Sequence, residues 1–235
     1  MINNFYVFIP ARGGSKSIKD KNLQEILGIP LVERSIKLAL KRFDRDNIVI
    51  SSDSQKILKF GDKYSISLHL RSEETSTDNA STETAIREWL LEKSLNVSWI
   101  ILLEPTSPFI NLEDLDKIIE LCSKNPEEGC IHSISEVRHT DHFLNQRIKE
   151  KNKVNFLFPD EREKNRLKQK KIKTFKFGNI SSIRADDIRK SKSFFSKNSL
   201  SFTIPYLRSI NIDSIEELLI ARSIANYEPK YYHLD

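Results

Sequence analysis

The chain contains little cysteine and has no long apolar segment. Its two cysteines, Cys122 and Cys130, have no neighbouring CxxC or histidine pair, so we interpret them as buried thiols in a reducing compartment, with a disulfide between them as the alternative. No run of about 18 apolar residues occurs. The first residues, MINNFYVFIPARGG, also lack the charged, apolar and small-residue succession of a secretory signal. We therefore expect a cytoplasmic protein that makes no membrane contact.

Several common catalytic motifs are also missing. There is no GxxxxGK[ST] loop, no GxGxxG motif and no convincing Ser/His/Asp or Cys/His set. His132 falls on one side of an expected strand, where a histidine more often belongs to the core or the surface than to a catalytic site. These absences fit a reaction that requires no covalent nucleophile.

Positive charge is concentrated in one part of the chain. The formal net charge is +5, and a large share of the lysines lies between Lys149 and Phe177. Such a run can bind nucleic acid, but Asp160, Glu161 and Glu163 interrupt it, and a solvated helix or hairpin has the same composition. We therefore expect no nucleic-acid partner.

Apolar runs of strand length alternate with amphipathic segments of helix length from Phe5 to the mid-130s. This alternation predicts an α/β fold with a mainly parallel, Rossmann-like nucleotide-binding sheet and helices on both faces. The 235 residues suffice for one such core. Because the alternation breaks down in the middle of the chain, we divide it into a core, residues 1–137 and 178–235, and an insertion, residues 138–177. The expected strands are 5–9, 47–51, 66–70, 98–103 and 130–137; the expected helices are 31–42, 55–63 (closed near Gly61), 83–93, 112–123 capped by Asn111, and one beginning after Ser214.

The basic loop, Ile9–Asn22, follows the first expected strand and combines two glycines with one arginine and three lysines. Gly13 and Gly14 can adopt backbone angles that turn N–H groups toward an anion, and Arg12 and the lysines add positive charge nearby. The loop is a candidate phosphate cradle, although its composition also fits a solvated charge run.

Polar residues recur where other strands end. Asp53 follows the second expected strand and either faces a ligand or caps the next helix. A shaped EPTSP turn follows residues 98–103. Near the C-terminus, Asn211 and Asp213 alternate with two isoleucines, so their side chains should project from the same face.

The strand followed by PARGGSK and then KN resembles the N-terminal signature of the cytidylyltransferases that activate sialic acids and related nonulosonates as CMP-sugars. The segment Arg71, Asp78, Ala80 and Ser81, and the turn EPTSP, match further motifs of that family. The resemblance implies a CTP site in which Arg12, Lys21 and Asp213 act in catalysis. It assigns the nucleotide to Ala11, Arg12, Gly13, Gly14, Ser15, Lys16, Lys21, Asn22, Arg71, Ala80 and Ser81, and the sugar to Glu104, Pro105, Thr106 and Ser107.

The resemblance also implies Mg²⁺ held by Asp213 and Asn211, and a homodimer in which the insertion reaches over the partner's active site. The sequence departs from the family at three places: Glu104 replaces a glutamine, Gly178 and Asn179 are in swapped order, and Asn211 replaces an aspartate. We expect CMP transfer from CTP to a sialic acid-like nonulosonic acid. The alternatives are a nucleotidyltransferase for another acid sugar, such as an octulosonate, and a family-derived nucleotide-binding protein with reduced turnover.

Overall fold

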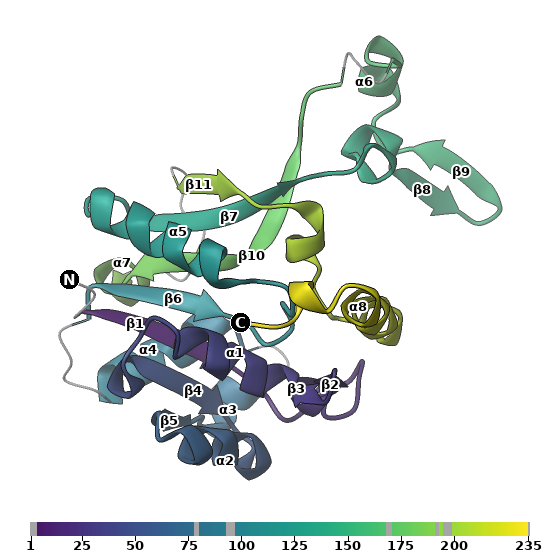
Figure 1. Cartoon of the computed structure of the whole chain (residues 1–235). Helices are drawn as coiled ribbons and strands as arrows, with labels where there is room; N and C mark the ends of the chain where they lie inside the picture. Colours follow the sequence, from purple (N-terminus) through teal and green to yellow (C-terminus); the bar gives the residue numbers. More distant parts are fainter. Residues whose placement is uncertain are drawn as a thin grey trace.

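The computed structural model describes residues 4–77, 80–92, 97–167, 171–190, 193–194 and 199–234. Its main feature is a seven-stranded sheet in the order β11-β7-β10-β6-β1-β4-β5 (Figure 1). The pairs β1–β4, β1–β6, β4–β5 and β7–β11 are parallel, which confirms the predicted sheet, while β10 runs antiparallel to both β6 and β7. The strands are β1 (Phe5–Pro10), β4 (Ile48–Ser52), β5 (Ser67–Leu70), β6 (Trp99–Leu103), β7 (Cys130–Glu136), β10 (Phe175–Arg184) and β11 (Leu200–Thr203).

Helices cover both faces of the sheet, as predicted. Alternation along β1 sends Val7 and Ile9 into a core with α1, α2 and α5, and Phe8 into a second core with α4 and α7. A third apolar cluster joins α8 to the small β2–β3 hairpin. The helices are α1 (Leu31–Ala39), α2 (Gln55–Tyr64), α3 (Glu73–Ser76), α4 (Thr82–Glu92), α5 (Leu112–Lys124), α6 (Pro159–Lys164), α7 (Ala185–Lys190) and α8 (Ile215–Tyr227).

The remaining elements are short. They are the strands β2 (Glu25–Ile26) and β3 (Ile29–Pro30), and the 3-10 helices η1 (Lys21–Leu23), η2 (Arg45–Asn47), η3 (His139–Asp141), η4 (Phe143–Asn145), η6 (Tyr206–Ser209) and η7 (Pro229–Tyr231). None of the helices in the described ranges is long and apolar enough to cross a membrane.

The ends of the helices follow local sequence signals with one exception. Asn111 caps α5 and Ser214 caps α8, both through capping boxes, which confirms those predictions. The predicted helix 55–63 is confirmed as α2, which continues one residue further, to Tyr64, and ends at Ser65 with φ of 53° rather than at Gly61. Gly61 instead allows close packing, since a Cβ there would lie 2.7 Å from Cγ2 of Ile50.

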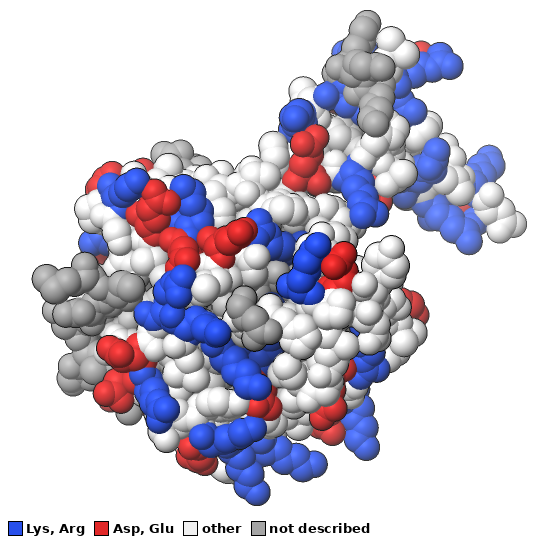
Figure 2. Space-filling view, viewed as in Figure 1, with Lys and Arg blue, Asp and Glu red and all other residues white. Residues whose placement is uncertain are grey.

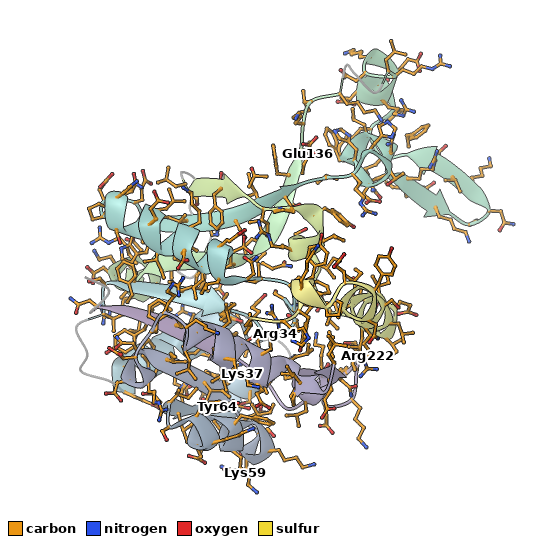
Figure 3. The ribbon with its side chains drawn as sticks, in the orientation of Figure 1. Arg34, Lys37, Lys59, Tyr64, Glu136 and Arg222 are labelled. Atoms are coloured by element: carbon orange, nitrogen blue, oxygen red, sulfur yellow. The ribbon has the colours of Figure 1, made fainter. Side chains whose placement is uncertain are left out.

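Residues between β7 and β10 form an arm that projects from the sheet, with the hairpin β8 (Arg147–Glu150) and β9 (Lys153–Phe156) and helix α6 at its outer end (Figure 1). Figure 3 labels Glu136 at the base of this arm, where Lys173 lies 3.4 Å from its carboxylate. The first residues of β10 belong to the sheet, since Phe175 pairs with Glu136 and Phe177 with Ile134. The arm is therefore slightly shorter than the alternation in the sequence suggests.

The swapped pair of Gly178 and Asn179 forms an irregularity in β10. The register with β7 shifts between Phe177 and Ser181, and Asn179 has φ of 79°. A Cβ at Gly178 would lie 2.6 Å from Oγ of Ser133, so only glycine fits there, and asparagine is one of the residues that tolerate positive φ. The order of these two residues is thus explained by backbone geometry.

Candidate active site

A cleft of about 450 Å³ lies at the carboxyl ends of β1 and β6, where open α/β sheets bind ligands. It brings together segments from five parts of the sequence: the basic loop, Arg71, the start of α4, the EPTSP turn and the segment before α8. The lining residues are Pro10, Arg12, Ser15, Lys16, Ser17, Lys21, Asn22, Arg71, Ala80, Thr82, Glu104, Thr106, Asn211 and Asp213.

The basic loop is held by hydrogen bonds to its own backbone and to neighbouring segments. Asn22 is buried, and its Nδ2 donates to the carbonyl oxygen of Arg12 at 2.8 Å. Nη1 of Arg12 donates to the carbonyl oxygen of Thr77 at 2.8 Å, which ties the loop to the segment after α3. These contacts fix the positions of the loop's charges in the cleft before any ligand binds.

The glycines of the loop act differently from each other. Gly13 packs against the turn after β4, where a Cβ would lie 2.7 Å from Cβ of Ser54, and its N–H donates to Oδ1 of Asp53 at 2.8 Å. Gly14 has open space around it. Neither glycine has positive φ, whereas Asp20 near the end of the loop is left-handed, with φ of 50°. The structure shows that Asp53 does not cap the next helix and instead supports the basic loop.

Lys21 and Asp213 meet across the cleft although 192 positions separate them in the sequence. Nζ of Lys21 lies 3.0 Å from Oδ1 of Asp213 and 3.1 Å from the carbonyl oxygen of Ile212. The N–H of Ile212 in turn donates to the carbonyl oxygen of Thr106, which joins this segment to the EPTSP turn. On the other side, Arg222 of α8 donates to the carbonyl oxygen of Glu25, just beyond the loop (Figure 3).

Asn211 and Asp213 project from the same face, as their alternation predicted. Nδ2 of Asn211 donates to Oδ2 of Asp213 at 2.6 Å, while Oδ1 of Asn211 is buried without a hydrogen-bond partner in the part of the chain that the structure describes. Amide and carboxylate oxygens are hard ligands of the kind that Mg²⁺ prefers. The donor set therefore fits a magnesium ion, with one negative charge fewer than two aspartates would supply.

Arg71 is buried at the edge of the cleft, and its Nε donates to Oγ of Ser51 at 2.8 Å. Burial lowers the pKa of Arg71 to about 10, against the opposing effect of Asp53. The guanidinium is still cationic at neutral pH, so it can serve an anionic or oxygen-rich ligand.

Glu104 is the partly buried carboxyl group of the cleft. Burial raises the pKa of Glu104 to about 7, the nearby Asp213 and Glu83 raise it further, and Lys21 opposes them. Near neutral pH this residue is present in both protonation states. It can therefore donate a hydrogen bond in one of them, as the family's glutamine can in all conditions.

The structure brings most of the predicted residues to this cleft, but not all. Ala11, Gly13, Gly14, Ser81, Pro105 and Ser107 are absent from its lining. Ser81 accepts a hydrogen bond from the N–H of Thr84 at the start of α4, and Ser107 is buried. Asp78 lies outside the described residues. Pro10, Ser17 and Thr82 also line the cleft, and they were not among the predicted site residues. Pro10 and Ser17 belong to the basic loop itself and Thr82 follows Ser81, which was the available signal.

Residues 6–201 match the cytidylyltransferase family. The chain is 27% identical to pseudaminic acid cytidylyltransferase of Campylobacter jejuni over 95% of this chain and 97% of that one. It is 34% identical to CMP-N,N'-diacetyllegionaminic acid synthase of Legionella pneumophila, over 48% of this chain and 50% of that one. It is 28% identical to N-acylneuraminate cytidylyltransferase of Escherichia coli, over 57% of this chain and 32% of that one. With these last two relatives it shares half of their length or less.

Solved structures agree on the fold. A CMP:2-keto-3-deoxy-manno-octonic acid synthetase complexed with CTP superposes with a TM-score of 0.70, at 14% identity and over 96% of this chain and 99% of that one. The 4-diphosphocytidyl-2C-methyl-D-erythritol synthase of Anaerococcus prevotii superposes with a TM-score of 0.62, at 14% identity and over 94% of this chain and 98% of that one. Because the family match covers most of the sheet and of the cleft, this chain belongs to the cytidylyltransferase family.

Proposed function

We propose that the protein transfers CMP from CTP to the anomeric hydroxyl of a sialic acid-like nonulosonic acid, giving a CMP-sugar and pyrophosphate. The observation that carries this proposal is the convergence of Arg12, Lys16, Lys21 and Asp213 on one cleft at the carboxyl edge of the sheet. Three of these groups are cations, as a triphosphate requires, and the fourth is a carboxylate that suits its metal ion. The end-to-end match to a pseudaminic acid cytidylyltransferase supports the choice of sugar class.

The reaction needs charge compensation and alignment more than it needs a nucleophilic side chain. CTP carries about four negative charges, and the sugar oxygen must approach the α-phosphorus in line with the leaving pyrophosphate. Arg12 and Lys16 bind the phosphates in this proposal, and Lys21 exchanges its ion pair with Asp213 for a phosphate oxygen. The carbonyl oxygen of Ile212 keeps Nζ of Lys21 in place during that exchange.

Asp213 and Asn211 would hold Mg²⁺. When bound there, the ion supplies further positive charge against the phosphates and orients them. Within this chain, the amide of Asn211 keeps the Asp213 carboxylate directed into the cleft, and Lys21 does so as well until it exchanges to the phosphate.

The sugar end of the cleft carries Glu104 and Thr106. Ser182 is fully buried, and its Oγ lies 3.1 Å from Sγ of Cys122, on the side of α5. Recognition of the sugar therefore falls mainly to the EPTSP turn in this proposal. An octulosonate is the alternative acceptor.

Pyrophosphate release tests the proposal. Purified protein with Mg²⁺ is assayed with each of the four nucleoside triphosphates against a panel of nonulosonic acids and an octulosonate, with Lys21→Ala as the inactive control. Release with CTP and a nonulosonic acid alone is the expected result. Release with the octulosonate alone would change the substrate class, and CTP binding without release for any pair would support a nucleotide-binding protein instead.

We also propose that the arm mediates a homodimer. A two-stranded hairpin alone is only marginally stable in water, yet β8 and β9 project from the core with apolar side chains in solvent (Figure 1). Ile148, Val154 and Ile172 are 46%, 55% and 66% exposed. Lysine and arginine side chains cover much of the rest of the arm (Figure 2). Light scattering of the wild-type protein should give twice the mass of one chain. The double variant Ile148→Asp with Val154→Asp should give the mass of a single chain. A wild-type monomer would refute the proposal.

Cytoplasmic location and the lack of a nucleic-acid partner remain part of the proposal. The nucleic-acid alternative rests on the lysines between Lys149 and Phe177, and most of these lie on the arm, where α6 places Asp160, Glu161 and Glu163 among them. Tight, salt-sensitive binding of RNA that does not depend on CTP would contradict this part.

A further inference from the structure

Arg71 reaches the cleft from a network of buried polar side chains that lies outside it. Nε of Arg71 donates a hydrogen bond to Ser51. Within the described ranges, its two terminal Nη atoms make no hydrogen bond. Arg71 also lines the cleft. The Nη atoms are thus available to a ligand, and the contact at Nε determines where they lie.

Ser51 connects Arg71 to His69. Ser51 and His69 are register partners on the adjacent parallel strands β4 and β5, at the end of the sheet where α3 also lies (Figure 1). Oγ of Ser51 lies 2.9 Å from Nδ1 of His69, and both residues are almost completely buried. Because His69 and Arg71 are two residues apart, both side chains can reach the same hydroxyl group.

The directions of these hydrogen bonds follow from what each atom can donate. Nε of Arg71 can only donate, so Oγ of Ser51 accepts from it and its own proton is available to Nδ1 of His69. We assign the hydroxyl as the donor to Nδ1, so that Nδ1 carries no proton and neutral His69 has its proton on Nε2. This tautomer turns an N–H group toward α4.

The carboxylate of Glu88 in α4 lies near that group, in an electrostatic contact rather than a hydrogen bond. Its Oε2 lies 3.4 Å from Nε2 of His69, and Glu92, one turn later, lies at 4.0 Å. Glu88 also accepts from the N–H of Ser72 at 3.2 Å and from the hydroxyl of Thr75 at 2.5 Å. Although His69, Glu88 and Glu92 cluster as metal ligands can, the carboxylate of Glu88 is already engaged by these donors.

The same carboxylate therefore supports two cleft arginines. Through His69 and Ser51 it is linked to Arg71. Through Ser72 and Thr75 it fixes the α3 segment, which continues to Thr77, and the carbonyl oxygen of Thr77 accepts from Arg12. None of these supporting residues lines the cleft.

We propose that His69 and Glu88 are positioning residues, which hold the guanidinium of Arg71 through Ser51 in the orientation that binds the nucleotide. This Arg71 network consists of Glu88, His69, Ser51 and Arg71. The inference rests on the proposed function, since it takes Arg71 as a nucleotide contact. It predicts a loss in ground-state binding of CTP with little change in kcat.

Two substitutions of His69 separate positioning from packing. His69→Asn places an amide near the position of Nδ1 and can still contact Ser51, while His69→Gln reaches toward Nε2 and loses Ser51. Both lose the ring, which packs against Phe8 at 6.1 Å between centroids. A generic packing effect would therefore be shared by both variants.

We expect His69→Gln to raise KM and Kd for CTP about tenfold, with kcat changed less than about threefold, as the loss of one charged hydrogen bond predicts. His69→Asn should restore KM to within about threefold of wild type. Ser51→Ala should match His69→Gln, and the double variant should be no worse than either single one, because both break the same link. The matched control is His132→Gln, which replaces a buried histidine of β7 outside the network.

An unchanged KM in His69→Gln, or equal losses in His69→Asn and His69→Gln, would overturn the proposal. Nitrogen-15 NMR provides a readout that needs no substrate: the Nε–H signal of Arg71, identified by its loss in Arg71→Lys, should exchange slowly in wild type and His69→Asn and rapidly in His69→Gln. If the wild type binds no CTP, the proposed function fails, and this signal still decides for or against the network.

Discussion

Glu104 should make the folded protein less stable as the pH rises, and Glu104→Gln should remove that dependence. Burial, with Asp213 and Glu83, raises the pKa of Glu104 from 4.5 to about 7. The folded state thus holds the proton more tightly than the unfolded chain does. The resulting stabilisation is complete below about pH 4.5 and is lost as the pH rises to about 7.

The size of the effect follows from the pKa difference. Raising a pKa from 4.5 to about 7 corresponds to about 3 kcal/mol, at 1.36 kcal/mol for each pH unit. About 2 kcal/mol of this falls between pH 5.5 and 8.5, because the part that is lost between pH 4.5 and 5.5 lies outside this range. At about 2–4 °C per kcal/mol for a chain of this length, the Tm of the variant minus that of the wild type should grow by about 4–8 °C.

Thermal unfolding at pH 5.5 and 8.5, followed by circular dichroism, measures this difference. Nucleotide is left out and EDTA is added, because a bound metal ion would add its own charge near Asp213. Glu127→Gln, which removes an exposed carboxylate, is the control and should give the same small Tm difference at both pH values. A Glu104→Gln difference that does not change with pH would refute the burial argument.

Three further predictions concern the loop, the metal and the arm's connection. Lys21→Ala should lower turnover at least about 100-fold with an unchanged Tm, since it removes a charge that stabilises the transition state; normal pyrophosphate release would reject that role. Asn211→Asp should lower the Mg²⁺ concentration for half-maximal activity, because it adds a negative charge, and an unaltered titration would count against the geometry. Gly178→Ala should lower the Tm by about 5 °C through overlap with Ser133, whereas Gly14→Ala, with open space around it, should not; equal melting would contradict the steric explanation.

The fold was largely predictable because the central parallel strands β4 and β6 are buried on both sides and stand out as apolar runs. The strands beginning near Ile48 and Trp99 are examples, and so are the caps Asn111 and Ser214, whose side chains act within four residues. The antiparallel strand β10 was harder to predict from the sequence. Its serines and its Gly178–Asn179 irregularity give no continuous apolar pattern, and its pairing partners lie far away in the sequence.

The sequence by itself determined the sheet, the basic loop and the likeness to cytidylyltransferases, since these depend on local patterns and on motifs that can be compared directly. Only the tertiary structure decided which polar residues meet. It placed Lys21 beside Asp213, showed that Asp53 supports Gly13, and put the buried His69 and the partly exposed Glu88 behind Arg71. Contacts between residues far apart depend on how the whole chain packs, and neither periodicity nor spacing along the sequence encodes them.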